Sequence, residues 1–296
     1  MIGDSHVNRQ KNDKKSYIML VSALSIMGTV GILRRYIPIS SALLVFFRGL
    51  IGALSILLFT WIFRKKDIKK ISRRAFMTLA LGGIFLGINW LLLFEAYNYT
   101  TIAKATLCYY LAPTIVLLLS PIIFKERLTQ KKLIAAAVSI IGMFFVSGMM
   151  ESGGRQPDDI KGILLGLAAA LFYALLVITN KKECESDAYT KCTVELFSAA
   201  IVLIPYLLMT ENFDTLGINL QTTVLILVAG IIYTGVAYVL YFGSMPGLRA
   251  QTISSLSYID PVVALVLPTI IFKEQLSLWG VLGAILILGS AIIGES

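Results

Sequence analysis

Apolar residues run along the chain in long blocks, and short polar or charged segments separate the blocks. Each block of about 18–24 residues is long enough, as a helix, to cross a bilayer core of about 30 Å. The pattern predicts an all-α membrane protein with ten transmembrane helices. These spans are expected at residues 17–33, 42–62, 75–97, 102–124, 132–149, 161–180, 192–209, 222–243, 250–272 and 277–294. The seventh span is the weakest of them, because it is short and carries Glu195.

The polar tail before the first span, residues 1–16, is basic, as at the start of a secretory signal peptide. No small-x-small cleavage site follows it, and nine more apolar blocks come after the first. We therefore expect the first block to be a retained membrane span.

One segment of 22 residues occurs twice. LCYYLAPTIVLLLSPIIFKERL (107–128) and SLSYIDPVVALVLPTIIFKEQL (255–276) align without a gap at an offset of 148 residues, and ten positions are identical. The match extends upstream, where Gly87 and Phe94 correspond to Gly235 and Phe242. The chain therefore divides into two repeats of five spans, residues 17–149 and 161–294, joined by a linker, residues 150–160.

A repeat with an odd number of spans must enter the membrane in the opposite orientation from its copy. Such inverted repeats are typical of transporters, because the two halves can exchange conformations and so open a central site to either side. We therefore expect a five-plus-five inverted repeat around a central cavity. A duplication retained only for packing is the less favoured interpretation.

The net charge of +9 could suggest nucleic-acid binding, but its distribution along the chain points to membrane topology instead. With the N-terminus inside, the inner segments hold 19 Lys and Arg residues, and the outer segments hold five. Basic residues gather in cytoplasmic loops of membrane proteins. We expect both termini in the cytoplasm, with Lys125 inside and Lys273 outside, and no nucleic-acid partner.

The ten spans, the inverted repeat and the FKE-x-L ending of spans 4 and 9 resemble the EamA family of the drug/metabolite transporter (DMT) superfamily. The resemblance covers roughly residues 17–294. It implies ten helices around a cavity lined mainly by spans 1, 3, 4, 6, 8 and 9. It also implies export or exchange of amino acids, amines, nucleotide sugars or other small metabolites, without naming the cargo.

Asp260 is the sharpest candidate for a site residue, because a carboxylate near the middle of a span is costly unless it is used. The following Pro261 cannot continue the helical hydrogen bonding, so a kink is expected there, and Pro113 predicts a matching kink in span 4. Asp260 could bind a substrate ammonium or carry a proton. A structural hydrogen bond to a neighbouring helix is an equally weighted alternative.

Polar and aromatic side chains fall on single faces of several spans, where they would meet the same cavity. They also occur as packing residues between helices, so each is weak evidence by itself. The expected substrate-binding residues, besides Asp260, are Tyr258, Ser254, Gln251, Asn89, Trp90, Tyr109, Tyr238 and Tyr241.

Four further charged residues have simpler expectations. Glu95 and Lys104 flank the short outer turn between spans 3 and 4, which predicts an ion pair at the outer mouth. Arg48 and Glu195 lie toward opposite ends of spans 2 and 7 and are poor candidates for pairing with each other. Extension of each side chain to the nearest interface is the expected explanation for both.

The residues exclude several kinds of chemistry. The one histidine, His6, is in the polar tail, and the three cysteines form no metal-binding pattern, so we expect no catalytic residue, metal or cofactor. No phosphate-binding loop of the GxxxxGK[ST] type occurs, so ATP hydrolysis is not expected. An intramembrane enzyme is therefore disfavoured.

The expected function is secondary transport of a small organic solute, such as an amino acid or amine, in an efflux direction through a bacterial inner membrane. Asp260 or Glu95 would carry protons if transport is proton-coupled. Besides the solute, membrane lipids are the expected partners, and the oligomeric state stays open. A multidrug or lipid-linked carrier flippase is the main alternative, although the polar stripes favour a polar cargo.

Overall fold

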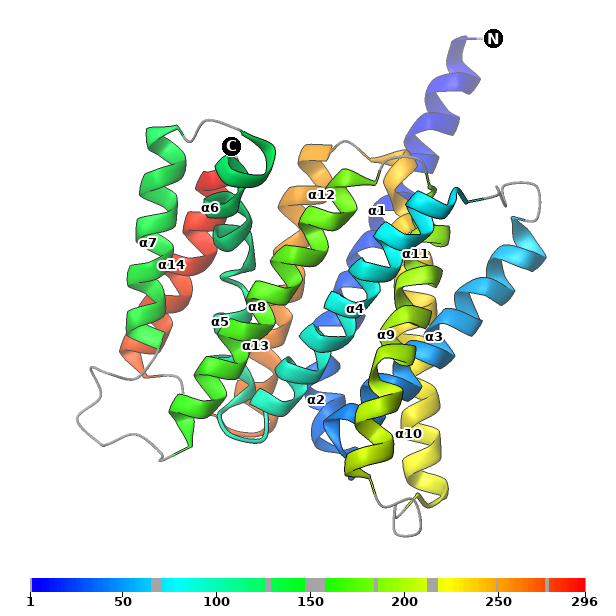
Figure 1. Cartoon of the computed structure of the whole chain (residues 1–296). Helices are drawn as coiled ribbons and strands as arrows, with labels where there is room; N and C mark the ends of the chain where they lie inside the picture. The colour runs from blue at the N-terminus through cyan, green and yellow to red at the C-terminus, as the bar shows by residue number, and fades with distance from the viewer. Residues whose placement is uncertain are drawn as a thin grey trace.

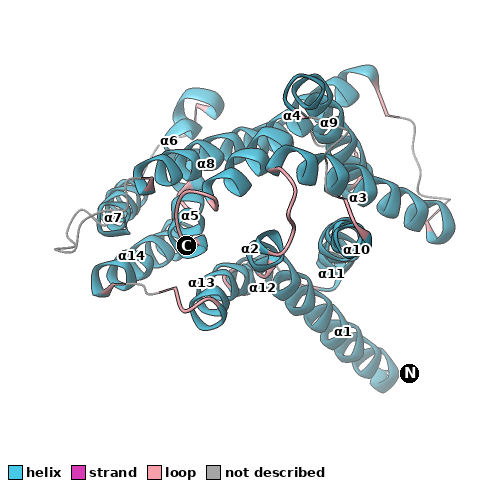
Figure 2. Cartoon of the chain, turned by 90° about the horizontal axis from the view of Figure 1, so that it is seen from below, coloured by secondary structure: helices cyan, strands magenta, loops and turns pink. Residues whose placement is uncertain are grey.

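The computed structural model describes residues 2–295 except 65–70, 126–128, 147–157, 184–185, 212–217, 249 and 275–276. For residues 2–13, 250, 251, 254, 255 and 291–295 it describes the backbone alone. Every described element is a helix or a loop (Figure 2). In the first half these are α1 (Ile2–Gly28), α2 (Val30–Arg35), α3 (Ser41–Phe63), α4 (Arg73–Ala96), α5 (Ile102–Tyr109), α6 (Ala112–Phe124) and α7 (Gln130–Val146).

The second half repeats this order. It contains α8 (Asp159–Lys182), α9 (Ala188–Thr210), α10 (Leu220–Gly230), the π-helix η3 (Ile231–Val236), α11 (Ala237–Ser244), the 3-10 turn η4 (Met245–Gly247), α12 (Ala250–Ser257), α13 (Ile259–Ile271) and α14 (Leu278–Glu295). Within the described residues these helices make the ten predicted spans, because spans 1, 4, 8 and 9 each join two or more of them. In the part of the chain that the structure describes, seven stretches are long and apolar enough to cross a membrane by themselves.

Polar side chains at the loop ends explain where several helices begin. Ser40, Ser72, Thr101 and Asn219 each accept a hydrogen bond from a backbone N–H in the first turn of α3, α4, α5 and α10. Span 7 begins four residues earlier than its apolar block, because Asp187 caps α9 and a polar first turn precedes the apolar run.

The two halves of the chain are related by the predicted inversion. Both chain ends lie at the upper end of the bundle in Figure 1, and α6 ends there. The matching helix α13 ends at the lower end, where residues 97–101 join α4 to α5 (Figure 1). Lys125 and Lys273, which follow these two helices, adopt the same left-handed backbone conformation, with φ of 56° and 53°.

Glycines allow the closest helix contacts. A side chain at Gly83 of α4 would overlap the backbone of Glu195 in α9, and one at Gly142 of α7 would overlap the backbone of Gly283 in α14. Without a hydrophobic driving force in lipid, such close backbone packing is a main source of helix association. Large apolar residues with more than half of their surface exposed, such as Trp61, Ile122 and Met209, are in keeping with a lipid environment.

Candidate functional site

A hydrogen bond links the breaks in spans 4 and 9, where the two halves of the chain meet. Tyr110 lies between α5 and α6, and Asp260 lies in the first turn of α13, directly after the break at Tyr258. The Tyr110 hydroxyl donates to Asp260 Oδ2 over 3.0 Å. The breaks come three residues before Pro113 and Pro261, whose rings cannot extend the preceding helix. Irregular backbone within a span occurs where protein or water lines it.

Tyrosine rings surround this link. Tyr109 packs against Tyr110 and against Tyr173 of α8, with ring centroids 5.6 and 5.3 Å apart. The rings of Tyr109, Tyr110 and Tyr173 thus form a phenol cluster beside Asp260. Tyr238 and Tyr241 of α11 pack edge-on against Phe242.

Arg48 does not extend to an interface, contrary to the sequence-based expectation. Its side chain on α3 is buried, with 5% of its surface exposed. Nε donates to the Thr234 hydroxyl over 2.9 Å, and the guanidinium carbon lies 4.0 Å from the Trp90 ring centroid and 5.5 Å from that of Phe94. The expectation was wrong because it ignored span 8, whose π-helix η3 brings Thr234 against α3 at Gly52.

The contacts of Arg48 compensate its charge only in part. Among the described residues no carboxylate lies within ion-pair distance of the guanidinium. Burying an ion costs several kcal/mol even after the protein relaxes around it. A desolvated ring face returns about 2 kcal/mol, and a hydrogen bond from a charged group about 1.5–3 kcal/mol. An arginine held this way would gain further stabilisation from an anion.

The other predicted binding residues have mixed placements. Trp90 lies beneath Arg48, whereas the Asn89 amide faces α8 and donates to the Ala169 carbonyl over 2.7 Å. Asn89 Oδ1 is buried without a partner among the described residues. Tyr258 is half-buried at the start of α13. The side chains of Gln251 and Ser254 lie outside the described residues.

The predicted Glu95–Lys104 ion pair is replaced by another. Lys104 Nζ lies 3.0 Å from Asp159 Oδ2 at the start of α8, where Asp159 Oδ1 also accepts from the Thr100 hydroxyl. Glu95 Oε2 instead accepts from the Ser41 hydroxyl over 2.8 Å. Glu95 and Lys104 lie at about equal depth in the hairpin, but this does not make them a pair, because α5 turns Lys104 toward α8 rather than toward α4.

A second set of charged residues fastens the lower end of the bundle. Arg35 of α2 pairs with Glu274 over 2.8 Å, and its guanidinium carbon lies 4.9 Å from the Phe272 ring centroid. Glu274 also accepts weakly from the backbone N–H groups of Ile102 and Ala103, at 3.3 and 3.4 Å. A carboxylate is favoured at a helix N-terminus. Glu274 thus ties α2, α5 and the end of α13 together.

Glu195 also differs from its expected position at an interface. It is buried on α9, with 6% of its surface exposed, and it faces Gly82 of α4. Glu195 Oε1 has no hydrogen-bond partner among the described residues. It corresponds by repeat position to Arg48, because 195 − 48 = 147, and the Arg48 and Glu195 side chains form no ion pair with each other.

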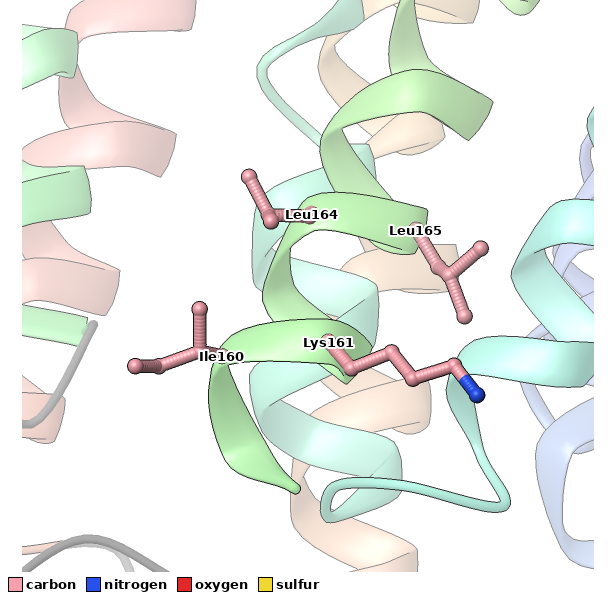
Figure 3. A pocket seen from close by; sticks show the side chains of 4 residues that line it. All are labelled: Ile160, Lys161, Leu164 and Leu165. Atoms are coloured by element: carbon pink, nitrogen blue, oxygen red, sulfur yellow. The ribbon is translucent and has the colours of Figure 1, made fainter. Parts of the chain in front are cut away.

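The surface pocket in Figure 3 is separate from these groups. It has a volume of about 500 Å³ and is lined by Ile160, Lys161, Leu164 and Leu165 of α8. None of the predicted site residues lines it. Over the described part of the chain, His, Cys, Asp and Glu side chains form no group of three or more that could hold a metal ion.

Sequence reasoning missed three features: the contacts of Arg48 with Thr234, Trp90 and Phe94, the Arg35–Glu274 ion pair, and Tyr173. The signal for Arg48 was present, because it is a charge within a span and such residues default to functional hypotheses. The signal for Glu274 was its place in the repeated Phe-Lys-Glu ending. Tyr173 had no distinguishing sequence signal beyond a single polar ring in span 6.

Comparisons with known proteins agree with this architecture. The EamA-like transporter family model matches residues 14–148 and 160–293. The uncharacterized transporter YxxF of Bacillus subtilis is 30% identical over 279 residues, which cover 94% of this chain and 88% of that protein. Protein RarD of Salmonella typhi is 27% identical over 211 residues, which cover 71% of this chain and 68% of that protein.

A solved crystal structure shares the fold at 17% sequence identity, with a TM-score of 0.65, over 95% of this chain and 96% of the other. The two family matches coincide with the two halves of the bundle, and the named relatives include transporters. This chain belongs to the EamA-like transporter family, within the drug/metabolite transporter superfamily.

Proposed function

We propose that this transporter moves a small organic solute by alternating access, in the export direction, through a bacterial inner membrane. The observation that carries the proposal is that the two ends of the helix bundle are structurally equivalent. Lys125 and Lys273 close matching half-helices at opposite ends of the bundle in the same left-handed conformation. Two copies of one unit in opposite orientations favour two states of similar energy, each open to one side.

The aromatic contacts at the two ends support this proposal. At the lower end Arg35 lies over the Phe272 ring. At the upper end, where α6 ends, Lys181 lies over the Phe124 ring, with Nζ 4.2 Å from its centroid. Phe124 and Phe272 are equivalent positions in the repeat, since 272 − 124 = 148. The lower end is fastened in this structure by Glu274, whose equivalent, Glu126, lies outside the described residues. A change from one state to the other would release the contacts of Glu274 at the lower end and form the equivalent contacts of Glu126 at the upper end.

We place the substrate at the breaks in spans 4 and 9. Asp260 would face a cationic group of the solute or carry a proton, and Tyr109, Tyr110 and Tyr173 would supply ring faces and hydroxyls. A ring face attracts a cation. The positions of both chain ends at one end of the bundle, together with the basic loops there, support a cytoplasmic location for both termini.

The test is counterflow in proteoliposomes that contain the purified full chain and no nucleotide. Vesicles are loaded with one unlabelled solute from a panel of amino acids, amines and nucleosides, and uptake of the same labelled solute is followed. Saturable counterflow of at least one solute by the wild-type protein supports the proposal, and in Asp260→Asn vesicles this counterflow should be lost or should no longer depend on pH. Equal rates in protein-free vesicles for the whole panel would refute it.

A further inference from the structure

We propose that Arg48 is a carboxylate-binding residue of the transport site, so that the cargo is a zwitterion whose carboxylate meets Arg48 and whose ammonium meets Asp260. This inference rests on the proposed transport function and deepens it. It begins from the guanidinium group, which is buried yet has a single hydrogen bond among the described residues, from Nε to Thr234.

The two terminal nitrogens of Arg48 are free to bind a ligand. Neither Nη donates to any residue in the described ranges, so four N–H groups remain available. Arg34 Nε is fully buried without a hydrogen-bond partner among the described residues, whereas neither Nη of Arg48 belongs to this class, so both Nη atoms keep a small accessible surface. A planar fork of N–H groups fits a carboxylate with two parallel hydrogen bonds.

The surroundings fix the direction of this fork. Trp90 and Phe94 cover the guanidinium with their rings, and Thr234 holds Nε. Thr234 is itself held, because its hydroxyl donates to the Ala229 carbonyl in the π-type spacing of η3. π-helical turns recur at functional sites. A donor held on three sides loses little conformational freedom when an anion binds.

A chain of aromatic contacts connects Arg48 with the opposite charge, Asp260. Phe94, which covers Arg48, packs against Tyr97 with ring centroids 6.2 Å apart. The Tyr97 hydroxyl lies 3.2 Å from that of Thr106, on the same span as Tyr110, which donates to Asp260. Asp260 uses one carboxylate oxygen to accept from Tyr110, and its other oxygen has no hydrogen bond among the described residues. A cation donor and an anion acceptor at the two ends of this chain of contacts recognise a solute bearing both charges. A simple amine would leave Arg48 unpaired.

The reporter for the test is Trp90, which stacks on Arg48. Replacing the half-exposed Trp61 and Trp279 by Phe leaves Trp90 as the single tryptophan. The purified full-length variant is titrated with each of the twenty standard amino acids and with the α-amide of each, which keeps the ammonium and lacks the carboxylate. We expect saturable fluorescence changes with at least one amino acid and an amide affinity weaker by about tenfold or more.

Three further variants decide the result. Arg48→Gln should remove the difference between acid and amide. Arg48→Lys should keep part of the difference between acid and amide, because the charge stays and the planar pair of Nη groups is lost. If Arg48→Gln does not insert into the membrane, Arg48→Lys decides the outcome. Arg64→Gln is the matched control, since Arg64 ends the same helix over the ring of Tyr189. It should leave the difference unchanged.

Equal affinities for acid and amide in the parent, a difference that survives in Arg48→Gln, or no saturable response to any amino acid would each overturn the carboxylate site. Counterflow separates this failure from failure of the transport proposal. If amines or nucleosides still exchange in proteoliposomes, the transporter stands without a carboxylate site. If no solute exchanges, both proposals fall.

Discussion

Arg35 and Glu274, which come from opposite halves of the chain, form a 2.8 Å ion pair at the lower end of the bundle. Their exposures differ, because 37% of the Arg35 side chain is exposed and only 6% of the Glu274 side chain. A pair with one exposed partner contributes little by itself, roughly 0–1 kcal/mol. The contact therefore derives its importance from the three helices that Glu274 joins, and not from the pair alone.

Glu274→Gln should loosen the lower end of the bundle. The amide keeps the size of the side chain, but it removes the charge that Arg35 and the α5 N-terminus share. Tyr36 and Phe272 have ring centroids 6.0 Å apart, so cysteines at these positions should be joined by a short bis-maleimide. We expect a severalfold lower cross-linking yield in Glu274→Gln. Asp159→Asn, a matched change at the α5–α8 contact, should leave the yield unchanged, and a drop in both variants would indicate general loosening.

The inverted arrangement predicts opposite accessibility for Lys125 and Lys273. In a background with Cys108, Cys184 and Cys192 replaced, single cysteines at the two positions are exposed to an impermeant maleimide in intact cells. We expect labelling at 273 and none at 125, because the two follow matching helices at opposite ends. Labelling of both positions from outside would contradict the inversion.

The Lys104–Asp159 pair should depend on its orientation. Both side chains are largely buried, with 15% and 8% exposed, so loss of one partner leaves a poorly solvated charge and should cost about 3 kcal/mol of stability. Exchange of the pair, Lys104→Asp with Asp159→Lys, should recover more thermal stability in detergent than either single change retains. The matched exchange, Lys104→Glu with Glu95→Lys, should recover no thermal stability. Recovery there would instead support the Glu95–Lys104 pair expected from the sequence.

Asp260→Asn should abolish transport or its pH dependence, because it keeps the shape and removes the charge. Tyr110→Phe removes only the hydrogen bond to Asp260, so the charge stays and transport should fall without being lost. Initial rates of counterflow across a range of pH provide the measurement, with membrane insertion checked by fluorescence-detected size exclusion. Wild-type rates in Asp260→Asn would make the carboxylate structural.

Gly83→Ala should separate α4 from α9, because the added Cβ would overlap backbone atoms of Glu195 and the side chain of Ser198. Overpacking of this kind costs about 1–3 kcal/mol. Gly289→Ala is the matched control, since nothing lies within 4 Å of the Cβ that it adds. Melting temperatures in one detergent should fall for the first change and stay within error for the second.

Local patterns were enough to predict the spans and their order, because apolar length and basic loops are properties of neighbouring residues. The prolines at 113 and 261 likewise indicated where spans 4 and 9 would break. The contacts of the site depend on helices that meet far apart in the sequence. Thr234 lies 186 residues from Arg48, and Asp159 lies 55 residues from Lys104. Which side of a span faces which neighbour is a property of packing, and the hairpin argument for Glu95 could not include it.

The π-helix in span 8 marks the point where the second repeat has one residue more than the first. The helix caps Ser72 and Asn219 differ by 147 residues, as do Gly83 and Gly230, whereas Gly87 and Gly235 differ by 148. The extra residue therefore falls between Gly230 and Gly235, within η3 (Ile231–Val236). A π-turn absorbs such an addition without ending the helix. Thr234, which holds Arg48, lies in this added turn, so the first repeat has no counterpart of that contact. A difference of one residue between the copies thus makes two otherwise equivalent halves chemically different.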